Sequence, residues 1–248
     1  MRMRFFTWPN ATRTRFRKEG FCVVENALTP EGLNFLVDQS NAELAQVSYL
    51  PRGWGERFPA VSPTLSEVPV FTDEFESTLK RICGRTTSQL GNLEYPQHAF
   101  SRQIEGDWGY ETHIDGSSGT REDYAGRYEV LIGVLLSPVV DADDGALVFW
   151  PGSHLDVREN LRAKPRDYLR TAIHDCVPDL LAKRVPTVMA PPTPFVGAVG
   201  TAVICHRLLV HGTASRRRPG VRQMVYFRLN ITSYDKDALV KETAFAQL

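Results

Sequence analysis

The chain has 248 residues, of which 42% are hydrophobic and 23% are charged, a composition typical of a globular protein. Its 29 basic residues balance 29 acidic residues, so the formal net charge is +0 and nothing favours a nucleic-acid or membrane partner. No stretch approaches the ~20 apolar residues that span a bilayer. We expect a single domain over residues 1–248.

The start of the chain is locally basic and lacks the apolar segment of a secretory signal. No acidic residue precedes Glu19, which would also suit a transit peptide, but we favour a solvated N-terminal arm. The cysteines lie far apart and form no CxxC pair: Cys22, Cys83, Cys176 and Cys205. This spacing is typical of a reduced chain and not of a disulfide scaffold, so we expect a cytoplasmic protein.

The first part of the chain predicts one strand and two helices. The apolar run 21–24 predicts a strand. Thr29-Pro30-Glu31 predicts a helix start, because threonine caps, proline suits the first helical position and glutamate faces the positive end of the helix dipole. A second helix is predicted over residues 71–83.

Short β-type runs separated by Gly, Pro, Asp and Ser clusters make up most of the remaining chain. The predicted strands cover residues 98–104, 110–114, 128–136, 146–150, 187–189, 201–206 and 223–230. Many short strands favour a sandwich or jelly roll. The charged stretch 155–181 predicts a partly helical insertion over one mouth of the barrel. We predict an α+β, mainly β, fold: N-terminal helices flanking a jelly-roll core at about residues 90–232.

His113-Ile114-Asp115 is the first candidate for metal chemistry. On a strand, residues two apart project from the same face, so His113 and Asp115 would point together while Ile114 points into packing. An imidazole and a carboxylate suit a divalent metal. A solvated strand end or a simple His–Asp hydrogen bond would give the same pattern.

His211-Gly212-Thr213 supplies a third candidate ligand 98 positions later (211 − 113), so the ligands must come from different strands. Gly212 would let the backbone turn sharply beside the site. Two histidines and one carboxylate form the facial arrangement that leaves open positions on non-haem Fe(II). A Cys205/His206/His211 site is a weaker alternative, since neighbouring residues on a strand face opposite ways.

Arg222 follows His211 by eleven residues and begins a predicted strand. A guanidinium there could clamp a dicarboxylate with two parallel hydrogen bonds. Strand alternation places one set of side chains on the face of Arg222: Met224, Tyr226 and Arg228. The alternative is a surface arginine within a basic run.

Together these pieces resemble the phytanoyl-CoA dioxygenase family of Fe(II)/2-oxoglutarate oxygenases. The ordered set is His113-x-Asp115, Gly145-Ala146-Leu147 with Pro151-Gly152-Ser153-His154, His211-Gly212-Thr213 and Arg222, and the opening Gly20 to Glu25 with Leu28 to Glu31 is also similar. The resemblance implies a double-stranded β-helix that uses Fe(II), 2-oxoglutarate and O₂.

The resemblance also implies roles for single residues. His113, Asp115 and His211 would hold iron, and Arg222 would bind the distal carboxylate of 2-oxoglutarate with support from Thr213. Gln97 and Arg102 lie in the region that relatives use for the other carboxylate. Related halogenases replace the carboxylate ligand with a small residue, so the retained Asp115 favours hydroxylation.

Tyr110 and Trp150 are candidates for the wall of a substrate pocket, although either could serve packing alone. We expect a small-molecule metabolite as substrate; the sequence does not choose among metabolites or fix the oligomeric state. Two rival functions stay open: a zinc hydrolase or isomerase on the same three ligands, and a non-catalytic jelly-roll binding module.

Overall fold

A computed structural model describes residues 9–46, 52–54, 70–83, 97–104, 109–115, 130–164 and 169–229. In chain order the elements are α1 (Pro9–Glu19), β1 (Phe21–Val24), α2 (Pro30–Gln46), β2 (Arg52–Trp54), α3 (Asp73–Cys83), β3 (Gln97–Arg102), β4 (Val130–Leu135), β5 (Leu147–Phe149), α4 (Ser153–Arg162), α5 (Leu169–Ala182), α6 (Pro186–Met189), β6 (Thr193–Pro194), β7 (Ala202–His206), β8 (His211–Thr213) and β9 (Val221–Leu229). Among these helices none is both long and apolar enough to cross a membrane.

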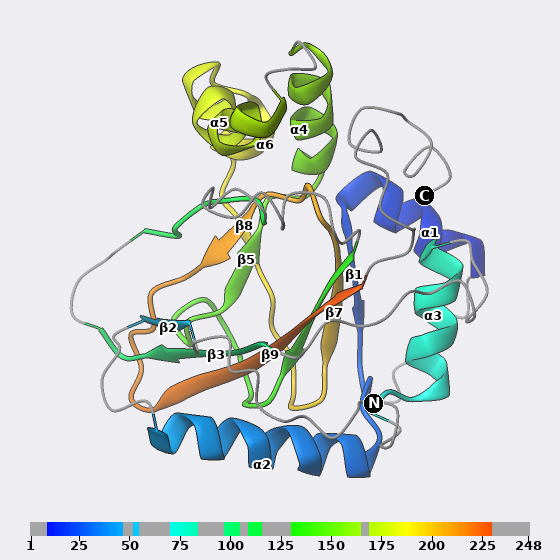
Figure 1. The fold of residues 1–248 in the computed structure, drawn as a ribbon, viewed down its shortest axis with the longest axis vertical. Coiled ribbons are helices and arrows are strands. Elements are labelled where there is room, and N and C mark those ends of the chain that lie inside the picture. The colour runs from blue at the N-terminus through cyan, green and yellow to red at the C-terminus, as the bar shows by residue number, and fades with distance from the viewer. Residues whose placement is uncertain are drawn as a thin grey trace, which may run out of the picture.

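Two antiparallel sheets face each other and form the predicted jelly roll (Figure 1). The larger sheet has the order β1-β7-β4-β9-β3-β2, and the smaller has the order β6-β5-β8. Neighbouring strands such as β7 and β4 are far apart in sequence, so side chains from distant segments meet inside the barrel.

Strand alternation divides the fold into layers, and β9 shows this directly. Met224 and Tyr226 point into the barrel, where they pack with residues of β4, β5 and β7. Val225 and Phe227 point the other way, into a second core that includes side chains of α1, α2 and α3. The alternation predicted for β9 is therefore confirmed, and it turns Arg222 and Arg228 toward the barrel interior.

The two predicted N-terminal helices are confirmed, and a threonine caps the start of each: α2 begins after the predicted cap Thr29, and α3 begins after Thr72. Thr29 Oγ1 accepts the backbone N–H of Gly32 at 2.9 Å, and Thr72 Oγ1 accepts that of Phe75 at 3.3 Å. Helix α2 then lies along the larger sheet (Figure 1), where Ser40 donates to Gln223 Oε1 at 2.5 Å.

A buried pair also joins α2 to β3. His98 Nε2 lies 3.8 Å from Glu43 Oε1, and the exposed fractions of the two side chains are 1% and 16%. Burial raises the pKa of Glu43 to about 7 and lowers the pKa of His98 to about 4. The two groups are consequently both neutral at mildly acidic pH.

The expected insertion is confirmed as helical. It comprises α4 and α5, which gather with the following α6 at one end of the molecule beside β5 and β8 (Figure 1). The apolar side chains of α4 and α5 pack on the outer face of the smaller sheet, in a core with Val148 and Trp150.

Three local predictions are wrong. Residues 9–19 form helix α1 instead of a solvated arm. Phe16 of this helix is 1% exposed and is buried in the core that β9 shares with α2 and α3. Residues 187–189 belong to the short helix α6, which has Pro186 in its first turn. Residues 110–114 form no regular strand; His113 alone makes a β-bridge, with His211.

Candidate metal centre

The three predicted ligands, His113, Asp115 and His211, lie together. One ligand atom from each residue falls within 4.8 Å of the others, and they are the only such group of three metal-binding side chains among the described residues. The rings of His113 and His211 have centroids 4.5 Å apart. The donor set is the two-histidine, one-carboxylate set that suits a divalent transition metal with open positions.

The backbone holds the two histidines opposite each other. His113 N–H donates to the His211 carbonyl at 2.8 Å, and His211 N–H donates to the His113 carbonyl at 2.9 Å. Thr213 N–H donates to the carbonyl of Tyr110, where a regular ladder would use that of Glu111. The segment before His113 therefore contains one extra residue, a bulge in which Glu111 adopts a positive φ of 45°.

Glycine is needed at position 212 because β8 lies very close to residues 110–113. The prediction that Gly212 allows a sharp turn is wrong. A Cβ at Gly212 would lie 2.0 Å from the carbonyl oxygen of Tyr110. Its φ is outside the left-handed region that favours glycine. Glycine lets β8 approach residues 110–113 closely enough for both histidines to reach one point.

Each histidine ring is oriented by a backbone carbonyl. The Nδ1 atom of His113 lies 2.6 Å from the Glu111 carbonyl, and that of His211 lies 2.8 Å from the Leu209 carbonyl. A carbonyl can only accept, so Nδ1 carries the hydrogen in each bond. Both Nε2 atoms are then available as metal donors, with the tautomer fixed by an outer hydrogen bond.

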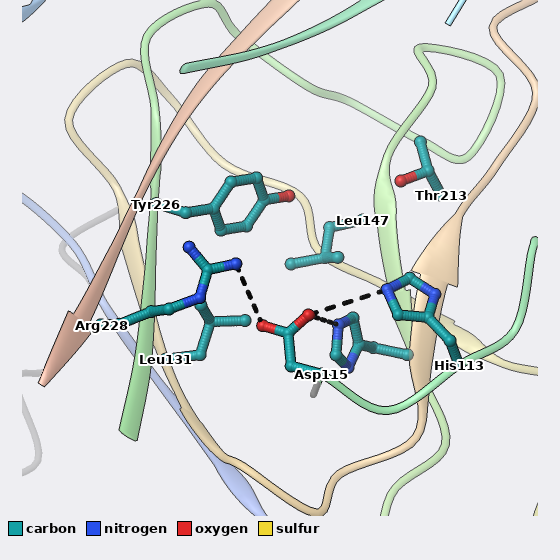
Figure 2. A pocket seen from close by; sticks show the side chains of 8 residues that line it. His113, Asp115, Leu131, Leu147, Thr213, Tyr226 and Arg228 are labelled. Carbon is teal, nitrogen blue, oxygen red and sulfur yellow. Dashed lines mark hydrogen bonds and ion pairs between the residues drawn. The ribbon is translucent and has the colours of Figure 1, made fainter. Parts of the chain in front are cut away.

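Asp115 divides its two carboxylate oxygens between two tasks. Its Oδ1 lies 3.9 Å from His113 Nε2 and 3.8 Å from His211 Nε2. Its Oδ2 lies 3.4 Å from Nη2 of Arg228 (Figure 2). The same guanidinium donates through Nη1 to Gln97 Oε1 at 2.8 Å. Gln97 thus reaches the site through Arg228.

Burial and charge set the protonation of the ligands. Burial lowers the pKa of His113, and the nearby His211 lowers it further, so His113 favours the neutral form that binds a metal. Burial also acts to lower the pKa of His211, but the Asp115 carboxylate outweighs it and the net pKa is raised. Binding of a metal ion to His211 therefore competes with a proton that Asp115 stabilises.

A cavity opens above the three ligands, with an empty volume of about 270 Å³ that includes the part open to solvent. Its lining residues are His113, Asp115, Leu131, Leu147, His211, Thr213, Tyr226 and Arg228 (Figure 2). Leu147 and Thr213 are register partners across β5 and β8, which explains why both face it. The lining combines polar and charged groups with apolar side chains, as in small-molecule sites.

Arg222 lies deeper in the barrel. It is 2% exposed, and its Nε and Nη1 atoms have no hydrogen-bond partner among the residues that the structure describes. Burial lowers its pKa, and the nearby Tyr226 opposes that effect. A buried guanidinium with unsatisfied donors is costly unless an anion completes it. Tyr226 lines the cavity and contacts Arg222, so it connects the two.

Three other predicted residues do not line this cavity. Arg102 lies on the face of β3 shared with His98 and Phe100, which points away from the barrel interior. Trp150 follows β5 on the outer side, where its Nε1 donates to the Ala190 carbonyl at 3.0 Å. Tyr110 is 39% exposed and meets the edge of Trp150.

Leu131, Leu147 and the role of Arg228 were not predicted from the sequence. Alternation could have selected Leu147 over Trp150, because the two lie three apart and face opposite sides of β5. The alternative Cys205/His206/His211 site is not assembled: His206 Nδ1 accepts the N–H of Leu208, and its ring lies 5.0 Å from that of His154. His154 itself bonds the Arg17 carbonyl through Nε2 at 3.0 Å and so joins α4 to α1.

Comparison with known families decides the relationship. The family model described as phytanoyl-CoA dioxygenase matches residues 16–224. The chain belongs to the phytanoyl-CoA dioxygenase family. The predicted resemblance is thereby confirmed, and the match spans both the helices and the jelly roll. A comparison with curated protein sequences finds no match.

Several solved structures share the fold of this family member. SnoN from nogalamycin biosynthesis, in complex with Fe3+, alpha ketoglutarate and nogalamycin RO, has a TM-score of 0.59 at 16% identity over 90% of this chain and 83% of its own. EctD from S. alaskensis, with 2-oxoglutarate and 5-hydroxyectoine, has a TM-score of 0.56 at 17% identity, and the match covers 89% of this chain and 75% of EctD. HygX from Streptomyces hygroscopicus, with nickel and 2-oxoglutarate, has a TM-score of 0.55 at 16% identity, and the match covers 90% of this chain and 87% of HygX.

Proposed function

We propose that this chain is an Fe(II)/2-oxoglutarate-dependent dioxygenase that oxidises a C–H bond of a small-molecule metabolite. The oxidation that we expect is hydroxylation. One observation carries the proposal: a His–Asp–His site and a buried arginine with unsatisfied donors lie in the interior of one barrel. A metal site alone would suit many enzymes, whereas a second, cationic site beside it suits a co-substrate with two carboxylates.

The residues present fit an Fe(II) ion. His113 Nε2, His211 Nε2 and Asp115 Oδ1 would be its ligands, since each Nδ1 is already engaged. Three protein ligands leave the remaining positions for co-substrate and O₂. When bound, the iron supplies O₂ activation coupled to decarboxylation of 2-oxoglutarate, which releases succinate and CO₂.

The chemistry of the residues in the barrel interior suits 2-oxoglutarate. Arg222 would take the distal carboxylate through its unsatisfied Nε and Nη1 donors, and the Thr213 hydroxyl would assist from β8. Tyr226, which lines the cavity and contacts Arg222, and Leu147, which also lines the cavity, would flank the carbon chain and keep water out. The solved relatives SnoN, EctD and HygX each hold alpha ketoglutarate or 2-oxoglutarate, which supports this assignment.

Hydroxylation is the outcome that the retained Asp115 favours, since a carboxylate ligand leaves no coordination place for a halide. The solved relatives include an epimerase and a carbocyclase. Their reactions are therefore the outcomes to compare when substrates are screened.

The test is uncoupled turnover with matched metals. The protein, freed of metal, is reloaded with Fe(II) or with Zn(II), and succinate and O₂ consumption are measured with 2-oxoglutarate present. We expect the protein loaded with Fe(II), and not the protein loaded with Zn(II), to release succinate in step with O₂ consumption. The Arg222→Met variant loaded with Fe(II) should release little succinate. Equal activity with Zn(II), or a metal-loaded protein that consumes no O₂ with any substrate tried, would overturn the proposal in favour of the hydrolase or the binding module.

A further inference from the structure

Among the described residues that line the cavity, Arg228 is the only charged one besides the metal ligands. It sits on the inward face of β9, two positions beyond Tyr226, with a side chain that is 13% exposed. Figure 2 shows its guanidinium aimed at Asp115 from the side opposite the histidines. The Arg228 guanidinium and a metal ion held by the three ligands would both be attracted to the Asp115 carboxylate. The role of a cation so close to a metal site therefore has to be explained.

The two oxygens of Asp115 explain the arrangement. Oδ1 faces both histidine Nε2 atoms, and Oδ2 faces Arg228 Nη2 at 3.4 Å. A metal ion drawn to both oxygens would have to approach the guanidinium cation, and like charges in a poorly solvated site repel strongly. Arg228 therefore opposes coordination through Oδ2.

Gln97 holds the guanidinium in this position. Its Oε1 accepts from Nη1 at 2.8 Å, while Nη2 is directed at Asp115. Gln97 and Tyr226 are register partners across β3 and β9, so the acceptor is anchored on a strand and not on a loop. The fork of the guanidinium is thus fixed at both ends.

We propose that Arg228 is a positioning residue that keeps Asp115 a one-oxygen ligand. By occupying Oδ2, it preserves the third open coordination position that a two-atom co-substrate and O₂ together require. The inference rests on the proposed function for its purpose, but its structural content, how Asp115 binds a metal, can be tested without turnover.

The experiment uses the full chain loaded with Co(II), whose visible absorption reports coordination number. The variants are Arg228→Met, which removes the cation at similar size, Arg228→Lys, which retains a charge, and Gln97→Leu, which removes the anchor. Arg222→Met is the matched control, since it removes a buried arginine from the same face of β9. Thermal unfolding is recorded for each, and crystals of the Co(II) forms of wild type and Arg228→Met are compared.

We expect Arg228→Met to change the Co(II) spectrum and to bring both Asp115 oxygens onto the metal, with 2-oxoglutarate turnover reduced about 10–100-fold. Arg228→Lys should restore much of the wild-type spectrum, and Gln97→Leu should shift it less. Arg222→Met should leave the Co(II) spectrum unchanged while losing 2-oxoglutarate binding.

The possible failures can be told apart. If Arg228→Met binds Co(II) through one Asp115 oxygen with the wild-type spectrum, the positioning role is wrong, even if the variant is less thermostable. If wild-type protein binds no Co(II) through His113, Asp115 and His211, both this inference and the proposed function are wrong. If the positioning role holds but no 2-oxoglutarate binds, only the proposed function falls.

Discussion

His113 and His211 exchange two backbone hydrogen bonds, of 2.8 and 2.9 Å, although 98 positions separate them. The same pairing that closes this part of the barrel therefore sets the spacing of two metal ligands. Since the backbone fixes both Cα positions and a carbonyl fixes each ring, the site is held in place before any metal arrives.

Gly212→Ala should damage this pairing. The added methyl group would meet the Tyr110 carbonyl at 2.0 Å, so β8 and residues 110–113 must separate. We expect the free energy of unfolding to fall by about 3 kcal/mol, at the upper end for overpacking, and metal affinity to fall with it. Denaturant unfolding and Co(II) titration measure the two effects.

Gly109→Ala is the control for that variant. An added Cβ at Gly109 meets no atom of the described residues within 4 Å, but its φ of 67° is unfavourable for alanine. We expect a loss of about 1 kcal/mol and unchanged Co(II) affinity. A Gly212→Ala protein as stable and as tight for Co(II) as the Gly109→Ala protein would contradict the close-approach account.

Arg222→Met should separate stability from function. The substitution replaces a buried guanidinium that has unsatisfied donors with an apolar side chain of similar length. We expect the protein without co-substrate to gain about 1–3 kcal/mol in the free energy of unfolding while 2-oxoglutarate binding is lost. Calorimetric titration and urea unfolding test this, and a destabilised variant that still binds 2-oxoglutarate would refute it.

Most of the fold could be predicted from the sequence, because β-strands and helix caps leave local signals. The threonine-proline start of α2 and the alternation of β9 are examples. Local signals failed where tertiary contact decides: α1 carries few apolar residues, yet Phe16 docks it on the sheet. Thr187 and Val188 are β-branched, which favours a strand, but the preceding Pro186 suits a helix start.

The site was predictable in its ligands but not in its surroundings. His113 and Asp115 could be paired by spacing, and Ile114 is buried on the opposite side, as predicted. Alternation also turned Arg228 inward, yet nothing local indicates that it meets Asp115, 113 positions away. Contacts of that kind depend on how strands are ordered in the sheet, which a single sequence does not state.

Glu43→Gln should change how stability depends on pH. The pKa of Glu43 is raised from an ordinary 4.5 to about 7, so its stabilising contribution is fully present below 4.5 and is lost as the pH rises through about 7. Glutamine mimics the neutral acid. We expect the variant to gain about 1–3 kcal/mol at pH 8 and almost nothing at pH 4.5, as measured by urea unfolding. An equal effect at both pH values would show that the pKa of Glu43 is not raised on folding.

The central claim is that one barrel holds a metal and a dicarboxylate side by side, and anaerobic titration tests it most directly. Fe(II) and then 2-oxoglutarate are added to the protein, and visible absorption is recorded. The account predicts a metal-to-ligand charge-transfer band that saturates at one equivalent in wild type, is absent in His211→Ala for want of iron, and needs far more 2-oxoglutarate in Arg222→Met. A wild-type protein that binds Fe(II) but develops no band with 2-oxoglutarate would contradict it.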